Sequence, residues 1–262
     1  MAKTSIRFLS WRCRSFALGR SRRLNMQENA LAPYRVPFFN RLARKVLRPI
    51  FRGLFHLLSS VCIRGLENVP KSGAYLVAIN HISLFEAPFI VAFWPSELEA
   101  MGAVEVWRRK GQNILARLYY GIQVHRGQYD RQVMEQALAI LASGRPLLIA
   151  PEGGRTHQPG LRRAYPGVAY LVERSGVPVV PVGIVGTTDD FLQRALRLER
   201  PKLEMNIGKP LRLPPILAKG EARRQARQRN ADLVMLAIAA LLPPEYRGIY
   251  AEFSLPAEEG IS

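Results

Sequence analysis

A histidine and a glutamate, His81 and Glu86, are the first candidates for chemistry in this 262-residue chain. The apolar, β-branched residues 75–79 come directly before Asn80 and His81 and predict a buried strand. Residues 84–94 predict an apolar helix, so Glu86 would lie in its first turn and could hold one imidazole nitrogen. The other nitrogen would then be free to take a proton from a substrate. A structural or solvated pair is the plain alternative.

Two arginines that follow predicted strands could bind a phosphate. Strand 146–150 leads into residues 152–156 (Glu-Gly-Gly-Arg-Thr), where the glycines would let backbone N–H groups approach an anion. Arg155 could grip that anion with two parallel hydrogen bonds, and Arg126 ends the predicted strand 121–126. Each motif alone is equally typical of a turn with a surface arginine. Two strand-end arginines beside a strand-end histidine favour a phosphate pocket, and His125 and His157 are interpreted as surface residues.

The composition of the chain limits the classes of partner and compartment. A formal net charge of +18 indicates an anionic partner, which could be a nucleic acid, an anionic lipid surface or a phosphorylated substrate. The two cysteines, Cys13 and Cys62, have neither metal-ligand spacing nor the pattern of a disulfide framework, so a reducing, intracellular setting is expected. No uncharged apolar run reaches 18 residues, so no transmembrane helix is predicted. No metal site is predicted either, because metal-ligand spacing is absent.

Predicted strands alternate with predicted helices over most of the chain. This order favours an α/β fold with a mostly parallel central sheet flanked by helices. The further expected elements are a short strand or turn at 101–106, a basic amphipathic segment at 107–120, strands at 177–184 and 203–207, the last at a sheet edge, and helices at 132–142, 170–173 and 223–242. We therefore expect four regions along the chain: 1–35 (a basic, disordered leader), 36–62 (amphipathic helices), 63–215 (the α/β domain) and 216–262 (a C-terminal helix and tail).

Residues 38–61 predict amphipathic helix, which Pro49 would divide or kink. Phe39 lies on an apolar, aromatic-rich face. The opposite face is almost purely basic and contains Arg41, Lys45, Arg48 and Arg52. This composition is typical of an interfacial helix on an anionic membrane. The alternative is a helix that packs its apolar face on the domain core and leaves its arginines in solvent.

Four motifs in order resemble the glycerophospholipid acyltransferase family, whose best-known members are lysophosphatidic acid acyltransferases. They are N-H-(x)4-acid, G-I-x-V-x-R, P-E-G-x-R and V-P-V-V-P-V-G, and they extend over residues 63–190. The resemblance implies acyl transfer from acyl-CoA or acyl-carrier protein to a lysophospholipid hydroxyl, first of all that of 1-acylglycerol 3-phosphate, without a cofactor. The N-terminal helices resemble the membrane-docking motif of that family, which implies a peripheral or monotopic protein on the cytoplasmic face of the cell membrane.

The resemblance also assigns roles to individual residues. His81 matches the general base, and Glu86 stands where the family usually has aspartate. The residues that match the acceptor-binding blocks are Asn80, Arg126, Glu152, Gly153, Gly154, Arg155 and Thr156. Those that match the block near the acyl chain are Val179, Pro181 and Val182. Gly154 replaces a common threonine and residues 103–104 lack a common lysine, which leaves room for other acceptors such as lyso-ornithine lipid or glycerol 3-phosphate.

The expected chemistry follows from the acceptor. A hydroxyl with a pKa far above 7 is a poor nucleophile, so a base such as His81 must remove its proton during attack on the thioester carbonyl. Glu86 would stabilise the imidazolium, and backbone N–H groups of the glycine loop could receive the oxyanion. Direct transfer without a serine or cysteine nucleophile is expected. The rival interpretations are a basic nucleic-acid-binding protein, for which no recognised motif is present, and a membrane-associated scaffold without catalysis.

Overall fold

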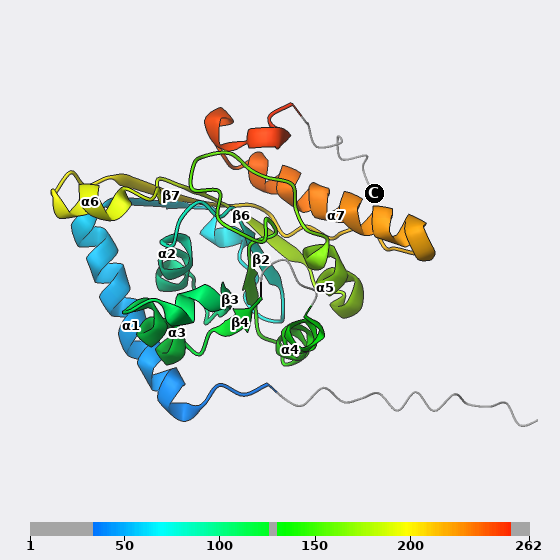
Figure 1. Cartoon of the computed structure of the whole chain (residues 1–262), viewed down its shortest axis with the longest axis horizontal. Coiled ribbons are helices and arrows are strands. Elements are labelled where there is room, and N and C mark those ends of the chain that lie inside the picture. The colour runs from blue at the N-terminus through cyan, green and yellow to red at the C-terminus, as the bar shows by residue number, and fades with distance from the viewer. Residues whose placement is uncertain (1–33, 126–129, 253–262) are drawn as a thin grey trace, which may run out of the picture. The chain divides into compact units, whose positions relative to one another are not determined.

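The computed structural model describes residues 34–125 and 130–252, and in these ranges the chain forms a seven-stranded sheet in the order β1-β7-β6-β2-β5-β3-β4 (Figure 1). The strands are β1 (Ser60–Arg64), β2 (Leu76–Ile79), β3 (Glu99–Ala103), β4 (Ile122–Val124), β5 (Leu147–Ile149), β6 (Val179–Val185) and β7 (Lys202–Ile207). Neighbouring strands are parallel except β6 and β7. The prediction of an α/β fold with a mostly parallel sheet is confirmed.

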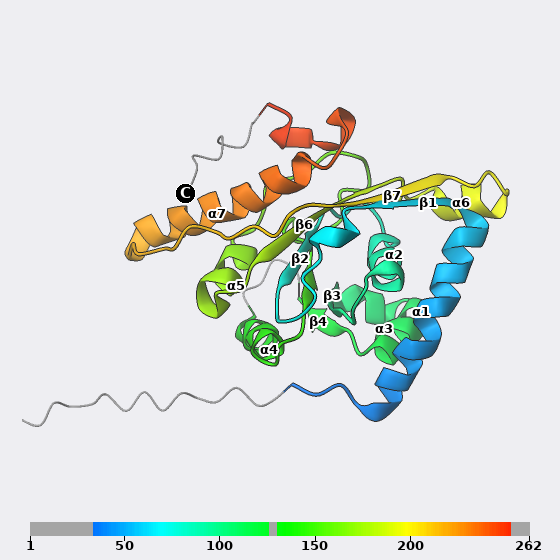
Figure 2. The same ribbon diagram turned by 180° about the vertical axis from the view of Figure 1, so that it is seen from behind.

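Helices cover both faces of this sheet (Figures 1 and 2). They are α1 (Phe38–Leu58), α2 (Glu86–Phe93), α3 (Gln112–Tyr119), α4 (Arg131–Ala142), α5 (Gly167–Ser175), α6 (Phe191–Leu196) and α7 (Gly220–Ala239). Short 3-10 turns are η1 (Leu66–Asn68), η2 (Val104–Arg108), η3 (Pro244–Tyr246) and η4 (Gly248–Tyr250). The predicted leader, residues 1–35, lies almost entirely outside the described residues.

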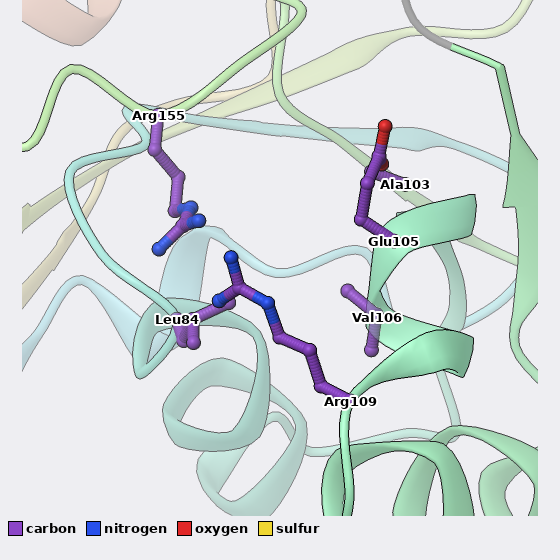
Figure 3. A pocket seen from close by; sticks show the side chains of 6 residues that line it. All are labelled: Leu84, Ala103, Glu105, Val106, Arg109 and Arg155. Atoms are coloured by element: carbon purple, nitrogen blue, oxygen red, sulfur yellow. The ribbon is translucent and has the colours of Figure 1, made fainter.

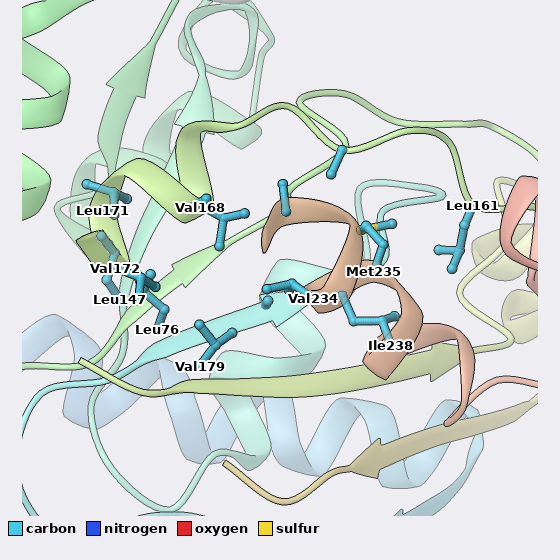
Figure 4. Close-up of a cluster of buried hydrophobic side chains, with 14 of the residues drawn as sticks. Leu76, Leu147, Leu161, Val168, Leu171, Val172, Val179, Val234, Met235 and Ile238 are labelled. Carbon is cyan, nitrogen blue, oxygen red and sulfur yellow. The ribbon is translucent and has the colours of Figure 1, made fainter. Parts of the chain in front are cut away.

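The side chains of β2 alternate between two hydrophobic clusters. Leu76 and Ala78 pack in the cluster covered by α4, α5 and α7, part of which Figure 4 shows. Val77 and Ile79 point to the opposite face and pack with side chains of α1, α2 and α6. All four residues are buried, as a strand enclosed by helices on both faces requires. β2 is therefore a rigid support for the residues that follow it.

Two expectations about the secondary structure were wrong. β7 lies between β1 and β6 instead of at the edge, because β1 pairs with it in parallel and was not predicted. The 36–62 region thus contains one helix and most of a strand instead of helices alone. α1 also continues through Pro49 without dividing. Pro49 lies inside α1 and has no backbone N–H, so the helix lacks the hydrogen bond that this residue would donate to the carbonyl of Lys45.

α1 packs with the opposite orientation to the usual amphipathic helix. The guanidinium of Arg48 donates to the carbonyls of Val91 and Trp94, and that of Arg52 donates to the carbonyl of Ala92. These carbonyls belong to the C-terminal end of α2, where cations interact favourably with the helix dipole. Arg48 is half-buried, and Arg52 stays exposed although it binds a carbonyl of α2, so the domain engages part of the predicted basic face. Arg41 and Lys45 are exposed as predicted.

The apolar face of α1 points away from the domain. Between 43% and 74% of the surface of its large apolar side chains is exposed; they are Phe38, Phe39, Leu42, Val46, Ile50, Leu54 and Leu57. The alternative of a helix with this apolar face packed on the core is thus wrong. No helix within the described residues is both long and apolar enough to cross a bilayer.

A buried ion pair fixes α1 to the sheet. Arg44 has no exposed side-chain surface and forms two hydrogen bonds with the buried carboxylate of Glu99, at 2.8 and 2.6 Å. The hydroxyl of Tyr34 and the guanidinium of Arg145 also donate to Glu99, at 2.7 and 2.8 Å. Burial alone would raise the pKa of Glu99, but the hydrogen bonds and charge of Arg44 outweigh burial, so this pKa is lowered. Because Glu99 begins β3, the network joins α1 directly to the sheet.

Candidate active site

The carboxyl end of β2 brings His81 and Glu86 together. The turn after the strand places Glu86 at the first residue of α2, and its Oε2 lies 3.1 Å from Nδ1 of His81. The Glu86 side chain is fully buried, whereas 18% of the His81 side chain is exposed. An Nδ1–H donated to Glu86 leaves Nε2 with a lone pair. The pair therefore has the geometry of a histidine base oriented by a carboxylate.

The second oxygen of Glu86 has partners of its own. Oε1 accepts from the backbone N–H of Ser83 at 2.9 Å and from the hydroxyl of Thr187 at 2.7 Å. Thr187 is fully buried and follows β6, so the sheet itself supports the carboxylate. These bonds compensate for the burial of Glu86 and fix the direction in which it faces His81.

The backbone of His81 is held on both sides by residues of the loop after β5. Its N–H donates to Oε1 of Glu152 at 2.9 Å, and its carbonyl accepts from the N–H of Thr156 at 2.9 Å. The other oxygen of Glu152 accepts from the N–H of Arg162 at 3.0 Å. Burial raises the pKa of Glu152, although these two backbone hydrogen bonds act in the opposite direction. Glu152 and Thr156 thus position His81, and the contact with substrate expected of them stays a prediction.

The side chain of Asn80 supports the sheet beside the site. Its Nδ2 donates to the carbonyl of Ile184 at 2.8 Å, and its Oδ1 accepts from the N–H of Ile184 at 2.7 Å. The side chain is buried and extends the pairing of β2 with β6 beyond the end of β2. Both polar atoms of the amide therefore serve the sheet, and the expected substrate-binding role of Asn80 stays a prediction.

The glycine loop is shaped by close packing of Tyr165. Gly153 has a φ of +66°, and a Cβ at this position would lie 2.7 Å from a carbon of the Tyr165 ring. Only glycine fits both conditions without strain. Arg162 donates to the carbonyls of Gly154 and Arg155, at 3.0 and 2.6 Å, and so fixes the next turn of the loop. This turn directs Arg155 toward a pocket.

The pocket has a volume of about 120 Å³ and is lined by Leu84, Ala103, Glu105, Val106, Arg109 and Arg155. Figure 3 shows the side chains of Arg109 and Arg155 extending toward each other from opposite walls. Leu84 lies between His81 and Glu86 in the chain, so the pocket adjoins the turn that carries the histidine. Arg109, Glu105 and Thr187 were not singled out from the sequence. The basic run at 108–110 was a signal for Arg109, but nothing in the sequence shows which cation of that run faces the pocket.

Several predicted site residues lie elsewhere. Val179, Pro181 and Val182 are buried in β6, where Val179 and Val182 belong to the two core clusters, so contact with an acyl chain is not supported. Arg126 lies outside the described residues, and its role stays a prediction. His157 is exposed and pairs with Asp189 at 2.8 Å, as expected of a surface histidine. In the described ranges, His, Cys, Asp and Glu side chains form no group of three or more that could hold a metal ion.

Comparisons with known proteins agree with this fold. Residues 60–185 match the model of the family described as Acyltransferase. A curated relative, the lyso-ornithine lipid O-acyltransferase of Pseudomonas aeruginosa, is 29% identical over 199 residues, which is 70% of this chain and 74% of the relative. The chain also resembles the crystal structure of the 1-acyl-sn-glycerophosphate (LPA) acyltransferase PlsC from Thermotoga maritima, with a TM-score of 0.54 and 22% identity. The match covers 74% of this chain and 79% of the PlsC chain.

The sheet, the histidine at its carboxyl edge and the family match define an acyltransferase. More narrowly, the family match and the curated relative support the glycerophospholipid acyltransferase family, as the four ordered motifs predict, and the solved structure shares the fold. These findings support the transfer of an acyl group to an oxygen as the class of reaction.

Proposed function

We propose that this protein transfers a fatty acyl group from acyl-CoA or acyl-carrier protein to the free hydroxyl of a lysolipid, with His81 as the base. The observation that carries the proposal is the His81–Glu86 pair, held at 3.1 Å beside an arginine-lined pocket. Nδ1 faces the carboxylate, so Nε2 is the atom that would take the proton. The carboxylate would stabilise the imidazolium that forms.

The proposed step is direct transfer. The acceptor oxygen attacks the thioester carbonyl as its proton moves to Nε2 of His81, giving a tetrahedral oxyanion. Collapse of this intermediate breaks the carbon–sulfur bond, and His81 returns the proton to the departing thiolate. The products are the acylated lipid and the free thiol of the carrier, so the histidine ends in its starting state.

Two acceptors are candidates. The two arginines of the pocket suit the phosphate of 1-acylglycerol 3-phosphate, the acceptor that the four motifs first suggest. The relative from Pseudomonas aeruginosa favours a lyso-ornithine lipid, whose head group carries a carboxylate and an amine. Ala103 lines the pocket at the position where a lysine would suit a phosphate, which also favours the second acceptor.

We further propose that the protein works at the cytoplasmic face of an anionic membrane. The exposed apolar face of α1, defined by Phe39, Leu42, Val46, Ile50 and Leu54, would enter the interface between head groups and acyl chains. Arg41 and Lys45 lie beside this face and would contact anionic head groups. Because Arg44 fixes α1 to β3, the domain would sit at a defined height above the lipid.

The test is acyl transfer by the purified chain on anionic vesicles. Labelled acyl-CoA and acyl-carrier protein are supplied in turn with 1-acylglycerol 3-phosphate, lyso-ornithine lipid or glycerol 3-phosphate, and the products are separated by chromatography. We expect a labelled ester with at least one lysolipid. Retention on DNA without product from any donor–acceptor combination would instead support the nucleic-acid-binding interpretation.

A further inference from the structure

The pocket beside His81 contains charges of both signs, although arginines dominate it. Arg155 comes from the loop after β5 and Arg109 directly follows η2, while Glu105 lies within η2. The side chains of Arg109 and Arg155 approach each other across the pocket (Figure 3). Two guanidinium groups that face each other repel, so an anion between them would be attracted by both. Leu84 and Val106 provide apolar walls to the same space.

Resting on the proposed function, we propose that Arg109 and Arg155 bind the carboxylate of a zwitterionic, amino-acid head group, and that Glu105 binds its ammonium group. Arg109 then becomes a specificity-determining residue outside every motif that suggested the reaction. A guanidinium can bind a carboxylate with two parallel hydrogen bonds, and two guanidiniums can hold it from opposite sides. The lysolipid hydroxyl would lie toward His81 at the end of the pocket near Leu84.

Glu105 provides the reason to prefer a zwitterion to a phosphate. With Glu105 ionised, the ionisable side chains that line the pocket carry two positive charges and one negative charge. A phosphate monoester near pH 7 carries more than one negative charge, and Glu105 would repel it. A head group with one carboxylate and one primary amine satisfies all three side chains. The pocket volume of about 120 Å³ suits a group of this small size.

The experiment measures binding in the absence of any acyl donor, so that turnover does not enter. The full chain is titrated in detergent micelles with lyso-ornithine lipid or with 1-acylglycerol 3-phosphate, and Kd is obtained by calorimetry. The variants are Arg109→Gln, Arg109→Lys and Glu105→Gln. Arg108→Gln is the matched control, because Arg108 is the adjacent exposed arginine and does not line the pocket. Thermal midpoints show that each variant is folded.

We expect Arg109→Gln to weaken binding of lyso-ornithine lipid by about 10- to 100-fold, the usual effect of losing a hydrogen bond to a charged group. Arg109→Lys should recover part of this loss, because it keeps the charge without the planar fork. Glu105→Gln should weaken the binding of lyso-ornithine lipid and strengthen the binding of 1-acylglycerol 3-phosphate. The difference between the two Kd values should therefore become smaller or change sign. Arg108→Gln should bind like the parent.

Three results would overturn the proposal, each in a different way. Equal binding by Arg109→Gln and Arg108→Gln would remove Arg109 from the site. If the ratio of the Kd values for the two lipids is the same in Glu105→Gln as in the parent, the pocket does not recognise an ammonium group. Failure of the parent to bind either lipid would overturn the proposed function together with this proposal, whereas the first two results would leave the proposed function standing.

Discussion

At the scale of single residues, one carboxylate links the proposed base to the backbone around it. Oε2 of Glu86 faces His81, and Oε1 accepts from Ser83 and Thr187. A carboxylate in the first turn of a helix could also act only through the helix dipole. Glu86 is completely buried and has partners on both of its oxygens, so an interaction with the helix dipole alone does not account for it.

Glu86→Gln is expected to lower kcat by about 10²- to 10⁴-fold, because an amide that donates to Nδ1 leaves the proton on Nε2. If the amide instead turns its nitrogen toward Ser83 and Thr187, two donors face each other and stability falls. Glu86→Asp keeps the charge and should retain a substantial fraction of activity. Kinetics and the thermal midpoint are measured on the same preparations.

The matched control for Glu86 is Thr187→Val, which removes one hydrogen bond from Oε1 but leaves the contact with His81. It should destabilise the protein by about 1.5–3 kcal/mol and keep most of the turnover. A Glu86→Gln enzyme with parental kcat and a lower thermal midpoint would limit Glu86 to a structural role.

At the scale of elements, α1 illustrates what the sequence can and cannot predict. The spacing of its apolar and basic residues predicted the helix and its two faces correctly. It could not predict which face turns inward, because the partners of its arginines, Glu99 and the last turn of α2, lie far along the chain. The basic face is thus shared between internal bonds and solvent.

Arg44→Met is expected to destabilise the protein by roughly 3–5 kcal/mol, because it leaves the buried Glu99 without its main partner. The double variant Arg44→Met/Glu99→Leu should recover part of this loss, since it removes the buried charge as well. Equilibrium denaturation of the parent, the single and the double variant measures both effects. A loss below about 1 kcal/mol for Arg44→Met would contradict the role assigned to the pair.

The same pair gives a pH dependence. Because the pKa of Glu99 is lowered by folding, its contribution to stability is complete above the unfolded value of about 4.3. The contribution is lost as the pH falls from there through the folded pKa. Acid should therefore reduce the free energy of unfolding more in the parent than in Arg44→Met. Parallel pH profiles of the two proteins would be inconsistent with this cause.

Membrane binding is expected to depend on the apolar face of α1 more than on all of its arginines. The variant Leu42→Ser/Ile50→Ser/Leu54→Ser should weaken partition onto anionic vesicles by at least about 100-fold, because each buried leucine or isoleucine contributes about 1.5–3 kcal/mol. Sedimentation with vesicles measures this partition. Leu217→Ser is the control, since Leu217 is 90% exposed but lies outside α1.

The basic residues of α1 should separate into two groups. Arg41→Gln/Lys45→Gln should weaken vesicle binding, with a larger effect at low salt. Arg48→Gln/Arg52→Gln should lower the thermal midpoint instead, because these side chains bind the carbonyls of α2. If Leu42→Ser/Ile50→Ser/Leu54→Ser binds vesicles as well as the parent does, the interfacial role of α1 is contradicted.

At the scale of the whole sheet, three neighbouring parallel strands assemble the site. β2 leads to His81, β5 leads to Glu152 and Arg155, and β3 leads through η2 to Arg109. Parallel strands with adjacent carboxyl ends bring such residues to one edge, as open α/β sheets generally do. The ends of β2 and β5 were predictable from the sequence, and so was their common edge, whereas the segment expected at 101–106 ran past the end of β3 at Ala103.

The remainder of the site could not be predicted because it depends on strand order and on loop paths. Asn80 bonds to the backbone of β6, and Thr187 reaches Glu86 from the loop after β6. Neither contact leaves a local pattern in the sequence. The bonds of Glu152 and Thr156 to the backbone of His81 were likewise not predicted from the sequence.

The most direct test of the central claim is kcat for His81→Ala beside His157→Asn, with the acceptor that the parent uses best. His157 lies near the same edge, pairs with Asp189 and has a φ of +65°, a conformation that asparagine tolerates. If His81 is the base, His81→Ala should be folded and about 10²- to 10⁴-fold slower, whereas His157→Asn should keep parental turnover. A folded His81→Ala enzyme with parental kcat would contradict the proposed mechanism.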